Sequence, residues 1–264
     1  MIACAGMDEV GRGALAGPLV AAAVAFSPTL VFPSPGCARA AASACAQPDH
    51  VGRLPCVSPS PRRSTDCCSA PPAPTRPGMA TVLSANPRVH LDLPGGDLGQ
   101  AHASVGVELV DSKLLTRDQR VVLDVWIRQH ATWIAIESIS VDAINRLGIG
   151  WANRVIFARL MARLGAVRYL VDGNLRLHGL APSGSQIVCE CAGDAHHPVI
   201  AAASIVAKVY RDRLMESLHQ AYPCYGWAHN AGYATPEHRD AVLAHGPSVY
   251  HRTLFLRRVL GKDT

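Results

Sequence analysis

A long proline-rich segment, residues 27–105, limits what this chain can fold into. The segment holds thirteen of the nineteen prolines, a single aromatic residue, Phe32, and no sustained hydrophobic period of 2 or 3.6 residues. A segment of this composition buries too little apolar surface to offset the conformational entropy lost on ordering. We therefore expect a disordered insertion, and residues 1–26 and 106–264 have to build the folded domain.

Composition excludes several classes of protein. The 264 residues carry a formal charge of +5 and a pI near 8.8, which favours a polyanionic partner. The longest apolar stretch near the start, residues 13–26, is shorter than the roughly 20 residues that a bilayer requires. Residues 1–9 contain two acids and no basic residue, unlike a signal peptide. We expect a cytoplasmic protein with no membrane partner.

The cysteines do not form a recognisable framework. Five of the nine lie in the proline-rich segment, where Cys67 and Cys68 are adjacent and no Cys-x-x-Cys pair occurs. This spacing argues against a zinc module, and without an export signal we expect reduced thiols.

Outside the segment, strand and helix patterns alternate. Residues 2–7 and 19–26 are small, apolar and partly β-branched, and the Gly/Pro-rich turn between them predicts a hairpin of buried strands. Thr116 begins a capping box of the form Thr-x-x-Gln, which predicts a helix. Further along, the pattern predicts a strand around 134–139, a helix over 151–164, a strand over 167–172, an amphipathic helix over 198–220, and a short helix from Thr235 to Gly246. The fold class is therefore α/β.

Four acids stand at the ends of these elements. Asp8 and Glu9 end the first strand, Asp172 ends a later strand, and Asp194 precedes the long helix. Each of them alone could serve as a helix cap or a turn residue. Gathered in space, they could hold hard divalent cations such as Mg²⁺, which prefer carboxylate oxygens and can act in phosphodiester displacement.

The residues beside the first two acids point to phosphate or sugar recognition. Asp8 and Glu9 are followed by Gly11-Arg12-Gly13, a turn whose exposed amides and guanidinium suit phosphate oxygens or hydroxyl groups. This motif resembles the opening motif of the ribonuclease HII family, the type 2 ribonucleases H. Five further blocks continue the resemblance in the family's order: Asp111-Ser112-Lys113, Val171-Asp172-Gly173-Asn174, Gly193-Asp194 with Ile200 to Val209, Gly232-Tyr233-Ala234-Thr235, and His251-Arg252-Thr253.

The resemblance implies a ribonuclease H-like fold, with a mixed sheet flanked by helices and a C-terminal helical portion. It also implies an endonuclease that cleaves the RNA strand of RNA–DNA hybrids and cuts at ribonucleotides embedded in duplex DNA. The expected products carry 5′-phosphate and 3′-hydroxyl ends, made by a two-metal mechanism. Family members usually act as monomers, so we expect a monomer with RNA–DNA hybrids and ribonucleotide-containing duplex DNA as partners.

Carried over position by position, the resemblance assigns roles to individual residues. Asp8, Glu9, Asp172 and Asp194 become the catalytic, metal-binding acids, with Mg²⁺ or Mn²⁺ as the cofactor. Gly11, Arg12 and Gly13 match the turn that contacts the ribonucleotide 2′-hydroxyl, the group that distinguishes RNA from DNA. Tyr233 matches the tyrosine that packs on the adjoining deoxyribose. The residues expected to contact phosphates are Ser112, Lys113, Ser204, Lys208, Arg211 and Arg252.

Two features depart from the family pattern. Family members commonly carry a lysine before the Gly-Tyr pair, where this chain has Asn230-Ala231. The second departure is the long insertion, which a surface loop tolerates because the cost of loop closure grows only as the logarithm of length. Two alternatives stay open at this point: a non-catalytic protein that binds hybrids, and another ribonuclease H-like nuclease such as a junction resolvase.

Overall fold

A five-stranded mixed sheet forms the centre of the fold. The structure is a computed structural model and describes residues 2–28, 89–93, 105–109 and 112–261. The strands follow the order β5-β2-β1-β6-β7; β2 is antiparallel to its neighbours β1 and β5, whereas β1, β6 and β7 are parallel. Their bounds are Ile2–Val10 for β1, Leu19–Phe26 for β2, Ala131–Ile139 for β5, Ala166–Asp172 for β6 and Gln186–Glu190 for β7. The carboxyl ends of three parallel strands therefore meet at one edge of the sheet.

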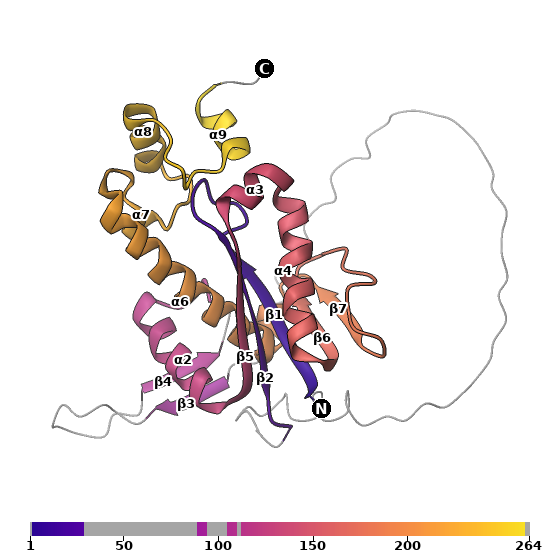
Figure 1. Cartoon of the computed structure of the whole chain (residues 1–264). Coiled ribbons are helices and arrows are strands. Elements are labelled where there is room, and N and C mark those ends of the chain that lie inside the picture. Colours follow the sequence, from indigo (N-terminus) through magenta and orange to yellow (C-terminus); the bar gives the residue numbers. More distant parts are fainter. Residues whose placement is uncertain (1, 29–88, 94–104, 110–111, 262–264) are drawn as a thin grey trace, which may run out of the picture.

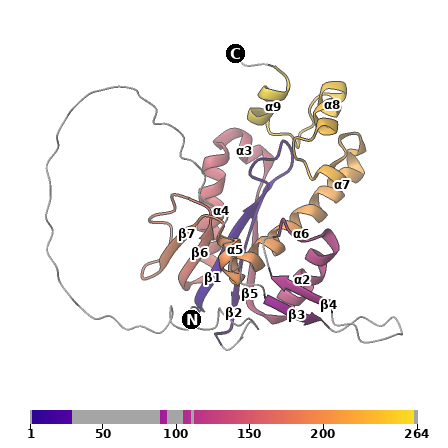
Figure 2. The same cartoon turned by 180° about the vertical axis from the view of Figure 1, so that it is seen from behind.

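Helices cover both faces of this sheet (Figures 1 and 2). On one face α4 packs against β1 and β2 through a core that includes Phe157 and Leu160; on the other face α6 and α2 enclose a second core around Leu123 and Val206. The helices are α2 (Arg117–His130), α3 (Val141–Leu147), α4 (Ile149–Leu164), α5 (Gly193–His196), α6 (Pro198–Ala221), α7 (Trp227–Asn230), α8 (Pro236–His245) and α9 (Thr253–Val259), with a 3₁₀ turn at Pro223–Tyr225.

Strand β2 shows why the apolar run predicted a buried strand. Ala21, Ala23 and Ala25 face the core beneath α4, while Val20 and Val24 face the core beneath α6. A strand covered on both sides has no polar face, so its sequence is apolar throughout.

Several predicted boundaries are confirmed by the backbone. Thr116 accepts from the N–H of Gln119 and completes the capping box of α2. Helix α4 ends at Gly165, which adopts the left-handed conformation with φ of 61°. Helix α8 begins at Pro236 after the N-cap Thr235 and ends at Gly246. Local capping chemistry therefore fixed these boundaries.

The proline-rich segment is only partly described. Most of the predicted disordered insertion, residues 27–105, lies outside the described residues. Within it, however, β3 (Val89–Leu93) pairs antiparallel with β4 (Val105–Leu109). The expectation that no part of 27–105 forms secondary structure is thus wrong for 89–93, where apolar residues alternate with His90 and Asp92 at the period of a strand.

The C-terminal helices pack on the β1–β2 connection. Ala16, in that connection, shares a small core with Trp227, Val242 and Leu256, and forms an isolated bridge with His251. Figure 1 shows α7, α8 and α9 gathered at this end of the sheet. Among the described residues, no helix is long and apolar enough to cross a membrane.

Candidate active site

Three carboxylates converge at the edge where the parallel strands end. Oxygens of Asp8, Asp172 and Asp194 lie within 4.8 Å of one another. Strand pairing explains the first two: Met7 on β1 is in register with Val171 on β6, so the next residues, Asp8 and Asp172, are neighbours. Asp194 joins them from the short helix α5, which follows β7.

Backbone contacts hold the elements that carry these acids. The N–H of Gly193 donates to Oδ1 of Asp172 at 2.8 Å, which ties α5 to the end of β6. Helix α6 crosses β1 so closely that a Cβ at Gly6 would lie 2.3 Å from the backbone of Val199. Glycine at this position therefore lets the start of α6 approach the acids.

Two of the three acids are shielded from water, and Asp172 is partly exposed. Asp8 is 6% exposed and Asp194 is 4% exposed. Burial raises the pKa of Asp8 well above its usual range, and the nearby charges of Glu9 and Asp172 raise it further. The three neighbouring side chains present an all-oxygen donor set, which suits Mg²⁺ or Mn²⁺. The three side chains thus fit a hard divalent cation.

Glu9, the fourth predicted acid, lies on the other face of the sheet. Successive side chains of a strand point to opposite faces. Met7 belongs to the core beneath α4 and Val10 to the core beneath α6, so Glu9 faces α4 while Asp8 faces α6. Burial raises the pKa of Glu9 to about 7, and the charge of Asp172 contributes to that rise. Glu9 is therefore electrostatically coupled to the cluster without belonging to its three-acid group.

Two buried serines support Asp8. The Ser204 hydroxyl is hydrogen-bonded to the Asp8 carboxylate, and the hydroxyls of Ser204 and Ser112 are 2.8 Å apart. Ser204 is 2% exposed and Ser112 is 4% exposed. The phosphate contacts of these serines stay a prediction; in this structure both hydroxyls are buried and hydrogen-bonded within the protein.

The two predicted lysines lie nearer the surface. The Nζ of Lys113 is 3.6 Å from Oδ2 of Asp194, and the Lys113 side chain is 77% exposed. Lys208 donates to Asp212 at 2.7 Å, and its Nζ lies 5.8 Å from the centre of the Tyr233 ring. Lys113 therefore borders the acid cluster, and Lys208 borders Tyr233.

The Gly11-Arg12-Gly13 turn follows directly after β1. Gly11 has φ of +91°, and a Cβ there would lie 2.2 Å from Nε of Arg211. The Arg12 side chain is 62% exposed, and its guanidinium is 3.9 Å from Oε1 of Glu9. No atom would lie within 4 Å of a Cβ at Gly13. The turn is thus packed tightly on its inner side and open on its outer side.

Two buried arginines hold this turn from within. Arg252 donates to the carbonyl oxygens of Gly11 at 2.7 Å, Arg12 at 3.0 Å and Gly17 at 2.8 and 3.0 Å. Arg211 donates to the carbonyl oxygens of Ala16 at 3.0 Å, Pro18 at 3.3 Å and Ala231 at 2.7 Å.

The structure does not support the phosphate contacts predicted for Arg211 and Arg252. Both residues are 0% exposed, so their guanidinium groups cannot meet a nucleic acid at the surface. Burial, together with the charge of Arg211, lowers the pKa of Arg252 to about 9. A rigid fork of N–H donors matches several carbonyl groups at once. Arg252 thereby positions the turn, and Arg211 positions the chain that follows it.

Tyr233 lies beside the same turn. The N–H groups of Leu15 and Ala16 donate to the carbonyl of Gly232 at 2.8 and 3.1 Å. The Tyr233 ring is partly exposed, and the guanidinium carbon of Arg211 lies 5.4 Å from its centre. The structure therefore brings together the turn and the tyrosine, which are more than 200 positions apart in the sequence.

A buried histidine network supports the backbone of Tyr233. His238 donates from Nδ1 to the Tyr233 carbonyl at 2.8 Å and accepts from Nε1 of Trp227 at 3.0 Å. Nε2 of His251 lies 3.1 Å from Nε2 of His238, and Nδ1 of His251 accepts from the N–H of Ser248 at 2.9 Å. Burial lowers the pKa of both histidines, that of His251 to about 4. Both rings are therefore neutral, and both nitrogens of each ring are hydrogen-bonded within the protein.

One residue beside the acids has no counterpart in the sequence motifs. Asn153 of α4 donates to Oε1 of Glu9 at 3.4 Å and is 4% exposed. A polar residue on the buried stripe of a helix was the available signal, because Asn153 falls between Ala152 and Ile156 in an otherwise apolar face.

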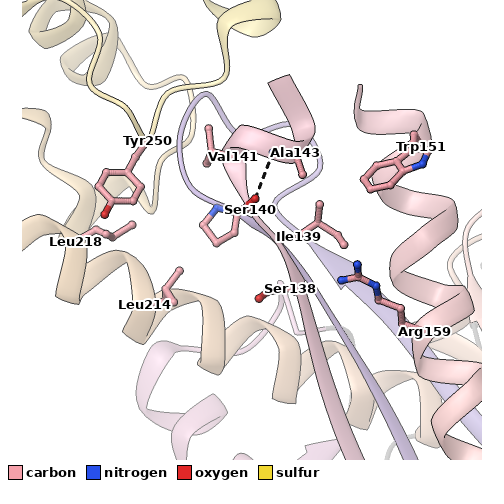
Figure 3. A pocket seen from close by; sticks show the side chains of 11 residues that line it. Ser138, Ile139, Ser140, Val141, Ala143, Trp151, Arg159, Leu214, Leu218 and Tyr250 are labelled. Carbon is pink, nitrogen blue, oxygen red and sulfur yellow. Dashed lines mark hydrogen bonds between the residues drawn. The ribbon is translucent and has the colours of Figure 1, made fainter. Parts of the chain in front are cut away.

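The structure also contains a cavity of about 440 Å³ (Figure 3). Its walls come from the end of β5, from α3 and α4, and from Leu214 and Leu218 of α6. Ser140 in its wall caps α3 by accepting from the N–H of Ala143. None of the four predicted acids lines this cavity.

Known proteins resemble this chain in sequence and in fold. Residues 102–258 match the family model described as Ribonuclease HII. Ribonuclease HII of Sphingopyxis alaskensis is 43% identical over 149 residues, which cover 56% of this chain and 73% of that protein. Ribonuclease HII of Paracoccus denitrificans is 42% identical over 159 residues, which cover 59% of this chain and 74% of that protein.

Solved structures match the fold. The ribonuclease H2 from Pyrococcus horikoshii aligns with a TM-score of 0.61 at 18% identity, covering 98% of this chain and 97% of that one. Bst-RNase HIII in complex with Mn²⁺ aligns with a TM-score of 0.54 at 15% identity, covering 100% of this chain and 70% of that one. The predicted ribonuclease H-like fold is confirmed by these alignments and by the mixed sheet with helices on both faces.

Proposed function

The chain belongs to the ribonuclease HII family, and from this premise we propose that it incises ribonucleotide-containing strands of nucleic acid duplexes with divalent cations held by Asp8, Glu9, Asp172 and Asp194. The family cleaves RNA in RNA–DNA hybrids endonucleolytically. The finer proposal is incision at single ribonucleotides embedded in DNA, giving 5′-phosphate and 3′-hydroxyl ends. The observation that carries it is the convergence of three carboxylates, two of them buried, within 4.8 Å.

The acids have the chemistry that such a reaction needs. Bound there as a pair, Mg²⁺ or Mn²⁺ would neutralise the carboxylates and stabilise the attacking and leaving oxygens of a phosphodiester displacement. Ser204 fixes the Asp8 carboxylate, and the Gly193 N–H fixes that of Asp172. The protein therefore presents oriented ligands before any substrate arrives, which lowers the reorganisation required during the reaction.

The recognition surface that we propose combines the Gly11-Arg12-Gly13 turn with Tyr233. The outer side of the turn is open, so its backbone groups and the exposed Arg12 can approach a ribose 2′-hydroxyl. The partly exposed Tyr233 ring offers an apolar face to the neighbouring deoxyribose. Arg211 contacts both parts, which supports a single unit that reads an RNA-to-DNA junction.

The proposal extends to domain organisation and oligomeric state. We assign residues 1–26 and 106–264 to the catalytic domain and treat 27–105 as an insertion. All acids, the turn and Tyr233 come from one chain, so one copy contains every proposed functional group. We therefore propose a monomeric enzyme.

Cleavage of defined duplexes tests this function. The full chain is incubated with Mg²⁺, Mn²⁺ or EDTA and an end-labelled DNA duplex that carries one ribonucleotide, beside an RNA–DNA hybrid and an all-DNA duplex. We expect metal-dependent cuts in the first two substrates, on the 5′ side of the ribonucleotide, and none in the third.

Matched variants assign the reaction to the cluster. Asp172→Asn should abolish cleavage while preserving the fold. Asp142→Asn, which changes an acid of α3 that is 72% exposed and paired with Arg146, should cleave like the unchanged chain. Binding of the duplex without any cleavage would contradict the proposal and favour a hybrid-binding protein, whereas cleavage of branched all-DNA junctions would favour a resolvase.

A further inference from the structure

Asn153 is the polar exception on the buried face of α4. The other buried residues of this helix are Ala152, Ile156, Phe157, Leu160, Met161 and Leu164. Burying an amide without full hydrogen bonding costs about 1–3 kcal/mol in proteins. The Asn153 Oδ1 atom is buried, and among the described residues it has no hydrogen-bond partner. A leucine, which has the same branched shape, would avoid this cost, so the fold alone does not explain the asparagine.

The contact that Asn153 does make is with the proposed active site. Its Nδ2 donates to Oε1 of Glu9 at 3.4 Å. Arg12 approaches the same oxygen from the solvent side at 3.9 Å. Within the described part of the chain, both side-chain contacts of the Glu9 carboxylate thus involve Oε1, so Oε2 is the oxygen that remains for another ligand.

We infer that Asn153 is a positioning residue that holds the Glu9 carboxylate in the orientation needed to share in cation binding. Glu9 is the acid that strand alternation directs away from the three-acid cluster, so it requires a partner on the α4 face to keep it at the sheet edge. An amide is suited to this task because it donates a hydrogen bond without adding charge to a site that already holds four acids. The inference rests on the proposed function of the acids and adds a residue outside the recognised motifs.

Electrostatics agree with this role. Burial is the main cause that raises the pKa of Glu9, and the hydrogen bond from Asn153 acts in the opposite direction, as does the charge of Arg12. The amide therefore favours the ionised carboxylate, which is the form that binds a cation.

The experiment compares Mn²⁺ binding by the full chain and by Asn153→Leu, with free Mn²⁺ measured by electron paramagnetic resonance and no nucleic acid present. Residues that orient metal ligands typically contribute 10- to 100-fold to metal affinity or activity, so we expect Mn²⁺ affinity to fall by roughly tenfold. On the hybrid substrate we expect a similar loss in kcat at saturating Mn²⁺ with KM for the duplex unchanged, because Asn153 is buried and cannot contact nucleic acid.

Phe157→Leu is the matched structural control. It removes volume from the same buried face one turn along α4 and leaves the Glu9 contact in place. We expect Phe157→Leu to lower the melting temperature yet retain Mn²⁺ affinity, and Asn153→Leu to retain the melting temperature yet lose affinity. Should Asn153→Leu fail to fold, Asn153→Ser and Asn153→Ala, which differ by one hydroxyl donor, provide the comparison, with tighter Mn²⁺ binding expected for serine.

The outcomes separate this inference from the proposed function. Equal Mn²⁺ affinity for the unchanged chain and Asn153→Leu would overturn the positioning role, even if the chain cleaves hybrids as proposed. Equal loss of affinity in Phe157→Leu would also overturn it, because the effect would then come from loosened packing. If the chain binds Mn²⁺ in an Asn153-dependent way but cleaves no ribonucleotide-containing duplex, the inference holds and the proposed activity fails.

Discussion

Replacing Glu9 by glutamine should stabilise the metal-free protein at alkaline pH. Burial raises the pKa of Glu9 from 4.5 to about 7 in the folded state. A carboxyl group with a raised folded pKa contributes stability below its unfolded pKa and loses that contribution as pH rises through the folded pKa. The difference between the two pKa values corresponds to about 3 kcal/mol, lost between pH 4.5 and about 7.

Glutamine keeps the size and the acceptor oxygen of Glu9 but cannot ionise, so Glu9→Gln should escape this loss. We expect the unfolding free energy of Glu9→Gln, relative to that of the unchanged chain, to rise by about 3 kcal/mol from pH 4 to pH 8.5. Urea unfolding in the presence of EDTA, at pH 4 and at pH 8.5, gives the free energy of unfolding of both proteins. The comparison removes the opposite pH dependence of the buried histidines, which both proteins share.

Added Mn²⁺ provides the internal control. A cation at the site neutralises Glu9 and its neighbours, so the advantage of Glu9→Gln at pH 8.5 should shrink when Mn²⁺ is present. A difference in unfolding free energy that stays constant from pH 4 to pH 8.5 would refute the reasoning, because Glu9 would then ionise equally well in folded and unfolded chains.

The remaining predictions concern the turn and its supports. Gly11→Ala should lower the free energy of unfolding by more than about 1 kcal/mol, because Gly11 has a positive φ and the added Cβ would clash with Arg211. Gly13→Ala should be tolerated, because no atom lies near its Cβ position. Melting temperatures of the two variants test this difference. In Arg252→Lys the ammonium group cannot reproduce the fork of N–H donors, so the free energy of unfolding should fall by at least about 2 kcal/mol and hybrid cleavage should be reduced. An unchanged free energy of unfolding in urea would contradict this prediction. In the folded protein the pKa of His251 is lowered from 6.5 to about 4, so the neutral ring contributes stability above pH 6.5 that is lost as pH falls through 4. The unfolding free energy from urea titrations should therefore change less between pH 7 and pH 4 for His251→Gln than for the unchanged chain.

Local chemistry made much of the fold predictable. The capping box at Thr116, the left-handed Gly165 and the proline after Thr235 each act within one turn of chain, so the sequence contains all the information they need. The apolar run of β2 likewise predicted a buried strand from local sequence alone. The pairing of β3 with β4 was missed because a short alternating pattern at 89–93 is embedded in a proline-rich segment.

Helix α6 shows where periodicity was insufficient. The sequence predicted an amphipathic helix over 198–220, but its apolar residue Tyr210 is 38% exposed, while Arg211 and Met215 are fully buried. The first half of α6 is apolar on nearly every side, so several stripes fit it about equally well. The charge of Arg211 argued for an exposed residue, and only the tertiary structure reveals the backbone carbonyls that satisfy it.

The arrangement of the four acids was also only partly predictable from the sequence. Motifs identified Asp8, Glu9, Asp172 and Asp194 as candidates, and parallel strand pairing explains why Asp8 and Asp172 meet. Strand alternation, which the sequence also contains, implies that Asp8 and Glu9 face opposite sides of the sheet. Asn153 could not be connected to Glu9 from sequence, because that contact depends on how α4 packs over β1.

The central claim is that the three clustered carboxylates bind a divalent cation. Anomalous diffraction from crystals of the full chain grown with Mn²⁺ would locate that cation directly. We expect a manganese peak within coordination distance of oxygens from Asp8, Asp172 and Asp194. A structure in which Mn²⁺ binds elsewhere, while these three carboxylates are neutralised by protons or by basic side chains of the protein, would contradict it.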